Sequence, residues 1–96
     1  MRLVVASPAA RDLFNAIEFY DDLALGLGQD LVDAFDSALS QILAFPHSGS
    51  PHLRNTRRIL LRGFPFSVVY RVKPDIIEVV ALAHRSRSPD YWTERS

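Results

Sequence analysis

Hydrophobic residues recur along the chain first at helical and then at strand spacing. A mostly apolar run from Arg2 to Ala6 predicts a short strand. Ser7-Pro8 follows it with an N-cap candidate and a proline suited to the first turn of a helix. Apolar residues then repeat every three or four positions while polar residues fill the opposite side. This pattern predicts an amphipathic helix that ends at about Leu23.

A second helical pattern follows after a short interruption. The glycines of Ala24–Gly28 break the first pattern, and the next one runs to about Phe45, where Pro46 stops it. Because the connection is short, the two helices should form an antiparallel hairpin whose apolar stripes need a further layer to cover them. The stretch from Pro46 to Thr56 is rich in Pro, His, Ser, Gly and Asn, which predicts a loop.

The last part of the chain reads as strands. Three segments are rich in β-branched and aromatic residues: 57–62, 66–72 and 76–83. Turn residues separate them, so they should form an antiparallel meander, and the third, apolar on both faces except for Glu78, should lie inside the sheet. We therefore predict one α+β domain over residues 1–96. It is a small twisted antiparallel sheet with an N-terminal strand, an α-helical hairpin packed on one face and a three-strand meander, in the order β-α-α-β-β-β.

The amino-acid composition limits the classes of protein to which the chain can belong. The chain is 48% hydrophobic and 23% charged, as is usual for folded soluble proteins, and it has no cysteine for disulfides or thiolate metal sites. Its apolar runs are far shorter than the ~20 residues of a membrane span. We expect a soluble, cytoplasmic protein without a signal peptide.

The net charge of zero conceals an asymmetry along the chain. Residues 1–50 hold two arginines against seven acidic residues, whereas residues 51–96 hold nine basic residues against four acidic ones. Such an imbalance indicates that the C-terminal half meets an anionic partner. The alternative is that the arginines, ten of the eleven basic residues, reflect genomic base composition.

Candidate functional side chains gather around the second and the last predicted strands. They are Arg54, Arg57, Arg58 and Arg62 around the former, and His84, Arg85, Arg87, Tyr91 and Trp92 after the latter. Strand ends in a meander can approach one another, so these groups could line one surface. Arginine binds phosphate or carboxylate through a planar fork of donors, and an aromatic ring can stack on an unpaired base. The alternatives are solvated strand ends, ion pairs with the acidic helices, and a hydrophobic lid made by Tyr91 and Trp92.

The histidines suggest little chemistry by themselves. His84 is a candidate general acid or base, but a single histidine without a placed partner is more often a structural hydrogen-bonding group. His47 and His52 lack the spacing of metal ligands. We expect neither a metal nor a cofactor.

Several segments, taken in order, resemble the RelE/ParE superfamily of bacterial toxins from type II toxin-antitoxin modules. They are the helical segment Ala9–Tyr20, the I-x-x-x-P of Ile42 and Pro46, the block RRILLRGFPFSVVYRV from Arg57 to Val72, and A-H-x-x-R-x-P-x-Y-W from Ala83 to Trp92. The resemblance implies a small growth-inhibiting toxin that a cognate antitoxin holds inactive. That antitoxin would cover the sheet face opposite the helices, at Val69 or the even-numbered residues of the last strand.

The resemblance implies one of two targets, because the superfamily contains two groups of toxins. RelE-like members cleave mRNA on the ribosome without a metal, and Arg58, Arg85 and Tyr91 match part of their catalytic set. In that reading Arg85 stabilises charge on the phosphate and Tyr91 orients or deprotonates the ribose hydroxyl. Ser67 and Leu60, however, stand where such members commonly carry basic residues.

ParE-like members instead inhibit DNA gyrase, and the incomplete nuclease set favours this subgroup. Arg57, Arg62, Arg87 and Trp92 are then candidates for binding the target. The expected function is a ParE-like toxin acting on DNA gyrase. The alternatives are a ribosome-dependent, metal-independent mRNA endonuclease and a non-toxic member that only binds the antitoxin.

Overall fold

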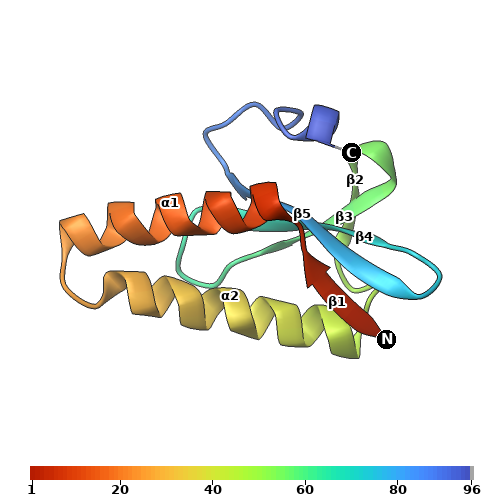
Figure 1. Ribbon diagram of the computed structural model, residues 1–96, viewed down its shortest axis with the longest axis horizontal. Coiled ribbons are helices and arrows are strands. Elements are labelled where there is room, and N and C mark those ends of the chain that lie inside the picture. Colours follow the sequence, from red (N-terminus) through yellow and green to blue (C-terminus); the bar gives the residue numbers. More distant parts are fainter. Residues whose placement is uncertain (96) are drawn as a thin grey trace.

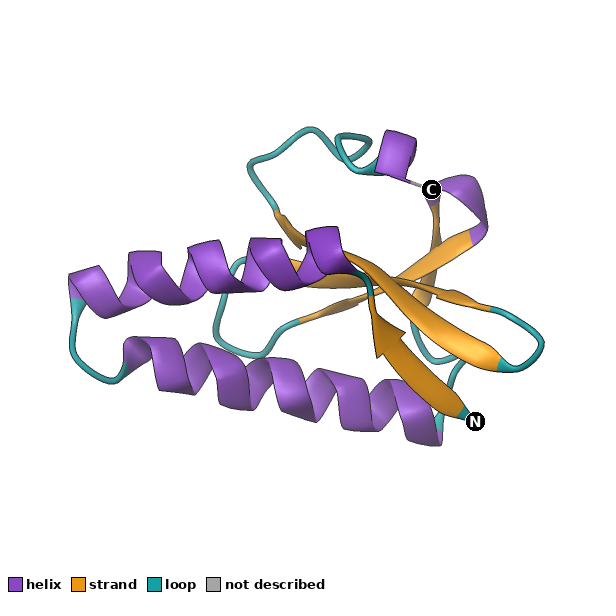
Figure 2. Ribbon diagram, in the orientation of Figure 1, coloured by secondary structure: helices purple, strands orange, loops and turns teal. Residues whose placement is uncertain are grey.

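The computed structural model describes residues 1–95 and contains the predicted elements in the predicted order. Two helices lie along one side of a twisted sheet (Figures 1 and 2). The elements are β1 (Arg2–Val5), α1 (Ser7–Leu23), α2 (Leu27–Ala44), β2 (Ser50–His52), β3 (Thr56–Leu60), β4 (Phe66–Val72) and β5 (Ile76–His84), with short 3-10 helices at Leu53–Asn55 and Thr93–Arg95. In the described part of the chain, neither α1 nor α2 is both long and apolar enough to cross a membrane.

The helical hairpin is closed by a contact between the two helices. Gly26 adopts a left-handed backbone conformation (φ 91°), which lets the chain reverse direction within a few residues. The carboxylate of Asp21, near the end of α1, accepts a hydrogen bond of 2.8 Å from the backbone N–H of Gly28. A side chain of the first helix thus satisfies a free N–H in the first turn of the second.

The sheet confirms the α+β prediction and adds two features to it. Its strand order is β1-β5-β4-β3-β2, and the three predicted meander strands are antiparallel neighbours. The N-terminal strand β1 pairs with β5 in parallel, so the sheet is mixed. The whole helical hairpin separates β1 from the other strands, and no tight turn sets its direction. The short strand β2 lies inside the segment predicted as a loop and pairs with β3.

The main core lies between the helices and the sheet. Its fully buried side chains include Leu31 and Ile42 of α2, Val68 and Tyr70 of β4, and Ile77 of β5. The Tyr70 hydroxyl accepts a hydrogen bond from the N–H of Gly49 and donates one to the Pro46 carbonyl. Any side chain at Gly49 would collide with the Tyr70 ring, because a Cβ there would lie 2.5 Å from the hydroxyl oxygen. The loop after α2 is therefore anchored to the middle of the sheet.

A second, smaller core covers the opposite face of the sheet. Val69, Val80, Ala81 and Trp92 are buried together there. Trp92 belongs to residues 85–95, the C-terminal strap, which turns back over the sheet after β5 (Figure 1). The chain's own strap, and not a partner, thus covers Val69.

The pairing of β4 with β5 is irregular at this point. Val69 is opposite Ala81 and Tyr70 is opposite Val79, which leaves Val80 as an extra residue. Val80 and Ala81 consequently face the second core, and Leu82 turns to the helix side. The expectation that even-numbered residues of β5 face away from the helices is thus wrong beyond Val80.

Candidate functional site: an arginine-lined cavity

Basic side chains converge on the sheet face that carries the strap. A cavity of about 540 Å³ lies there. It is lined by Arg58, Arg85, Arg87, His52, His84, Ser48, Ser50, Ser67, Ile59, Leu60, Val69 and Ala83. Among these described residues there is no carboxylate. The structure thus gathers part of the predicted arginine set into one electropositive hollow.

Local geometry explains why these arginines meet. Arg58 is paired with Val69 across β3 and β4, so it projects from the strap face. The backbone N–H of Arg85 donates to the Pro65 carbonyl, which fixes the start of the strap beside the turn between β3 and β4. The N–H of Arg87 donates to the carbonyl of His84 and tightens the same corner. Residues that lie 27 positions apart in the chain, Arg58 and Arg85, therefore share a cavity.

The two positions that depart from the nuclease pattern lie inside this cavity. Leu60 and Ser67 are paired across β3 and β4, and both line the cavity wall. Leu60 is 74% exposed. The basic residues that RelE-like enzymes are expected to carry there are thus replaced, in the same hollow, by an alkyl group and a small hydroxyl.

Tyr91 lies next to the cavity and not within it. It lines an adjoining cavity of about 190 Å³ that shares His84 and Arg87 with the first. The carbon atom at the centre of the Arg87 guanidinium lies over the Tyr91 ring, 4.0 Å from the ring centre. The Tyr91 hydroxyl points to the Leu82 carbonyl at 3.2 Å and to the Asp12 carboxylate at 3.4 Å. Burial and the Asp12 charge raise the pKa of Tyr91, so the phenol stays protonated and is poorly suited to act as a base.

Asp12 holds this corner together, although its position in the sequence suggested only a solvated helix face. Its two carboxylate oxygens accept hydrogen bonds of 2.7 and 3.0 Å from the Arg95 guanidinium. It also accepts one of 3.1 Å from the backbone N–H of Leu82, which lies beyond the end of the β1 pairing. Asp12 thus ties α1 to β5 and to the C-terminal strap. No local pattern signals this role, because the partners lie 70 and 83 positions away.

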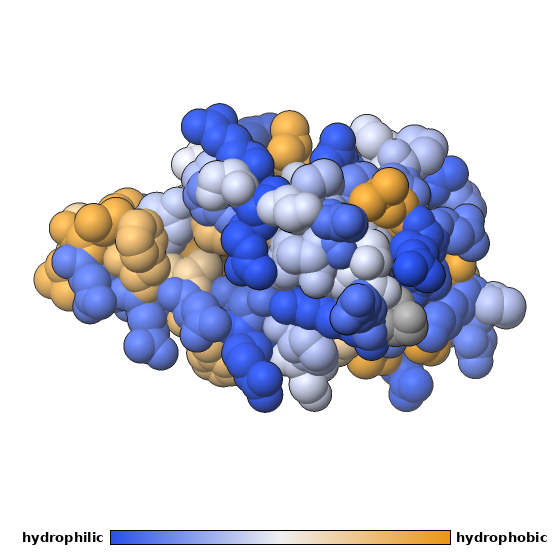
Figure 3. All heavy atoms as spheres, turned by 90° about the horizontal axis from the view of Figure 1, so that it is seen from above, coloured by the Kyte–Doolittle hydropathy of each residue, from blue (hydrophilic) through white to orange (hydrophobic). Residues whose placement is uncertain are grey.

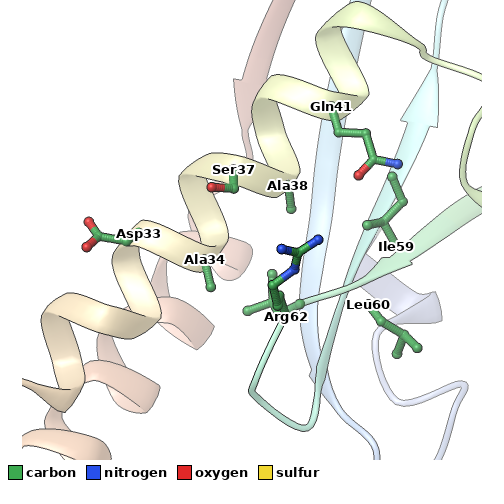
Figure 4. A pocket seen from close by; sticks show the side chains of 9 residues that line it. Asp33, Ala34, Ser37, Ala38, Gln41, Ile59, Leu60 and Arg62 are labelled. Atoms are coloured by element: carbon green, nitrogen blue, oxygen red, sulfur yellow. The ribbon is translucent and has the colours of Figure 1, made fainter.

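Three of the predicted target-binding residues lie elsewhere. Arg57 projects to the helix side and donates to the carbonyls of His47 and Gly49. Arg62 lines a different cavity, of about 610 Å³ between α2 and β3, and extends toward α2 (Figure 4). Trp92 is fully buried in the second core, so its indole does not reach the surface. The lid interpretation therefore describes Trp92 better than the binding one.

His84 has one nitrogen engaged and one available. Its Nδ1 accepts a hydrogen bond of 3.0 Å from the backbone N–H of Ser86, and the Ser86 hydroxyl lies 2.7 Å from the same nitrogen. In the neutral ring the hydrogen consequently resides on Nε2. His84 can then add a hydrogen-bond donor at the meeting point of the two cavities.

His52 is a second histidine whose surroundings matter. It lies in β2 with its ring centre 5.8 Å from that of Trp92, and it lines the arginine cavity. Burial and the nearby positive charge of Arg58 lower its pKa below the ordinary value of 6.5. The ring is therefore neutral near pH 7.

This shift predicts a pH-dependent loss of stability. The unfolded chain binds a proton at His52 near pH 6.5, whereas the folded chain binds it only at lower pH. The contribution of neutral His52 to stability is thus complete above its pKa in the unfolded chain. It is lost as the pH falls through its pKa in the folded chain. Urea unfolding at about pH 7.5 and about pH 5 should show a smaller acid-induced loss for His52→Gln than for the unchanged chain. The control is His47→Gln, at an exposed loop position. Equal losses in all three proteins would contradict the prediction.

The surface on the strap side is mostly hydrophilic. The large exposed apolar area of the molecule lies at another place. Figure 3 shows hydrophobic side chains gathered at the far end of the helical hairpin. Phe19, Leu23 and Leu25 are exposed there, Leu25 completely. The arginine cavity is thus separate from this apolar tip.

Comparisons with known proteins agree with this architecture. Residues 3–89 match the family described as ParE toxin of type II toxin-antitoxin system, parDE. The chain belongs to the ParE toxin family. Toxin ParE2 of Mycobacterium tuberculosis, in strains CDC 1551 / Oshkosh and ATCC 25618 / H37Rv, is 31% identical over 90 residues, which are 93% of this chain and 86% of the relative.

A solved structure shows the same fold. It is described as the chromosomal ParDE TA system from P. aeruginosa, and it superposes with a TM-score of 0.77 at 22% identity. The match covers 88% of this chain and 95% of the other. The predicted β-α-α-β-β-β architecture and the ParE-like assignment are both confirmed.

Proposed function

We propose that this ParE-family toxin inhibits DNA gyrase, that it does so through the arginine cavity, and that a cognate antitoxin neutralises it. The observation that carries the proposal is the convergence of Arg58, Arg85 and Arg87 on a hollow whose lining, among residues 1–95, includes no carboxylate, in a chain of the ParE family. Within residues 1–95 none of the three guanidinium groups forms an ion pair with a carboxylate. They are therefore available to a partner.

The geometry supports a binding role more than the nuclease alternative. Arg58 and Arg85 could stabilise negative charge on a phosphate, but the Tyr91 hydroxyl is turned toward Asp12 and the Leu82 carbonyl. Each missing donor in such a site typically costs about 3 kcal/mol of transition-state stabilisation, and Leu60 and Ser67 supply no positive charge. Incubating the purified toxin with ribosomes and mRNA tests this alternative, because specific cleavage would support it.

The proposed partner on the antitoxin side is a segment that carries acidic residues. Opposite charges across an interface speed association and select the correct partner. An antitoxin carboxylate that meets Arg58 or Arg85 would block the cavity from the target. The similar structure from P. aeruginosa is that of a ParDE system, which supports an antitoxin partner for this chain.

The test is a supercoiling assay with purified gyrase. We expect micromolar toxin to inhibit supercoiling, and the cognate antitoxin to restore it. The variant Arg58→Gln/Arg85→Gln should inhibit at least ~10-fold less well, because each lost charge-assisted contact costs about 1.5–3 kcal/mol.

The matched control removes the same number of positive charges outside the cavity. Arg2→Gln/Arg11→Gln removes two exposed arginines that do not line the cavity and should inhibit normally. Unaffected supercoiling at micromolar wild-type toxin would remove the gyrase proposal. Normal growth of bacteria that express the toxin without an antitoxin would instead indicate a non-toxic member of the family.

A further inference from the structure

The cavity gathers several positive charges on one face of the sheet. Arg58, Arg85 and Arg87 line it together with Ser48, Ser50 and Ser67, and none of the described lining residues carries a carboxylate. A single carboxylate satisfies the fork of one arginine, so three arginines in one hollow suit a ligand that carries several negative charges close together. Duplex DNA is such a ligand, with one negative charge per about 1.7 Å of its axis.

The basic side chains around the cavity have N–H groups available to bind a phosphate. The Arg87 guanidinium lies over the Tyr91 ring and forms no ion pair with a carboxylate among residues 1–95, so its N–H groups can meet a ligand. His84 Nδ1 is engaged by Ser86, which leaves the Nε2–H as an additional donor. Arg58 and Arg85 are exposed at the cavity wall.

Neither Tyr91 nor Trp92 offers an open ring face to a base. Trp92 is fully buried, and the Tyr91 ring is covered by Arg87 at 4.0 Å and approached by Arg95 at 5.1 Å. Recognition of single-stranded nucleic acid relies on exposed aromatic faces. Without them, the cavity favours the backbone of a duplex over unpaired bases.

We propose that the arginine cavity binds backbone phosphates of duplex DNA. This inference rests on the proposed function, since gyrase holds duplex DNA while it works. The toxin would then contact the DNA that gyrase holds as well as the enzyme. Such contacts carry no sequence information and position the protein on the duplex.

The experiment measures binding of the full-length toxin to a fluorescent duplex oligonucleotide by anisotropy, over a series of salt concentrations. Each phosphate contact contributes about −0.9 to the slope of log K against log salt, so three contacts predict a slope of about −2.7. The variant Arg58→Gln/Arg85→Gln/Arg87→Gln should lose nearly all binding and nearly all of this slope.

A control variant separates the cavity from overall charge. Arg2→Gln/Arg11→Gln/Arg62→Gln removes the same number of exposed arginines away from the cavity. It should retain the affinity and slope of the unchanged toxin. Circular dichroism and the fluorescence of Trp92 verify that both variants are folded. Equal weakening in the two variants, or no change in the cavity variant, would overturn the inference.

A further probe separates the duplex from single-stranded nucleic acid. Single-stranded RNA of the same length should bind more weakly than the duplex. Tighter binding of the RNA would assign the cavity to a different ligand class and would overturn the duplex proposal.

The outcome is distinguishable from failure of the gyrase proposal, because the anisotropy experiment contains no gyrase. A toxin that binds duplex DNA through the cavity but leaves supercoiling unaffected would refute only the target. An unchanged toxin that inhibits gyrase through the cavity but does not bind duplex DNA would refute only the phosphate site.

Discussion

Replacement of Trp92 with alanine is expected to lower the free energy of unfolding by about 3–5 kcal/mol. The indole is fully buried against Val69, Val80 and Ala81, and its removal leaves a cavity that small neighbours cannot fill. A domain of this size typically has only about 5–15 kcal/mol of stability in total. The variant should therefore unfold at a much lower urea concentration, as measured by circular dichroism because the protein has a single tryptophan.

Phenylalanine at the same position provides the control. The Trp92 Nε1–H is buried without a hydrogen-bond partner among residues 1–95, so its loss breaks no hydrogen bond. Trp92→Phe keeps most of the ring volume and should cost roughly half as much as the alanine change, or less. If Trp92→Ala unfolds at the same urea concentration as the unchanged chain, the strap does not contribute to the cooperative fold.

The second large effect is expected at Asp12. Its replacement with alanine should lower the free energy of unfolding by about 2–4 kcal/mol, because it leaves the Arg95 guanidinium and the Leu82 N–H without their acceptor. This cost lies below the usual one for breaking a fully buried pair, because the Arg95 side chain is 24% exposed. Urea unfolding gives the measurement.

Matched variants separate the ion pair from the helix position. Glu18→Ala, on an exposed position of α1, should change stability by less than about 0.5 kcal/mol. Asp12→Ala/Arg95→Ala should be less destabilised than the sum of its two single changes, because it leaves no uncompensated charge. A strictly additive double variant would show that the two side chains do not interact.

Much of the fold follows from patterns that neighbouring residues create. The amphipathic repeat of α1 and α2, the glycines between them and the turn residues around β4 are local signals, and the structure places these elements within a few residues of the predicted bounds. Confinement of β5 between two other strands also follows from its apolar character on both faces. The ParE-like resemblance rests on the same local segments and is confirmed by the family match.

The candidate site was less accessible to such reasoning. The residue pattern suggested that arginines could share a surface but not which ones, and only the superfamily resemblance singled out Arg58 and Arg85, which both line the cavity. Side chains alternate between the two faces of a strand, so adjacent Arg57 and Arg58 point to opposite faces, one to loop carbonyls and the other to the cavity. The extra residue at Val80 shifts this alternation again in β5. A bulge depends on how two strands pair, so the residues of one strand alone do not predict it.

By itself, the sequence determined the kinds of element, their order, the ParE-like class and the basic character of the C-terminal half. The tertiary structure alone decided that Arg58, Arg85 and Arg87 share a hollow, that Trp92 belongs to a second core, and that Asp12 anchors the strap. The physical reason is the separation along the sequence of the residues that interact. Helix and strand patterns arise between residues a few positions apart, whereas the site arises from pairings across the sheet and from contacts between the two ends of the chain.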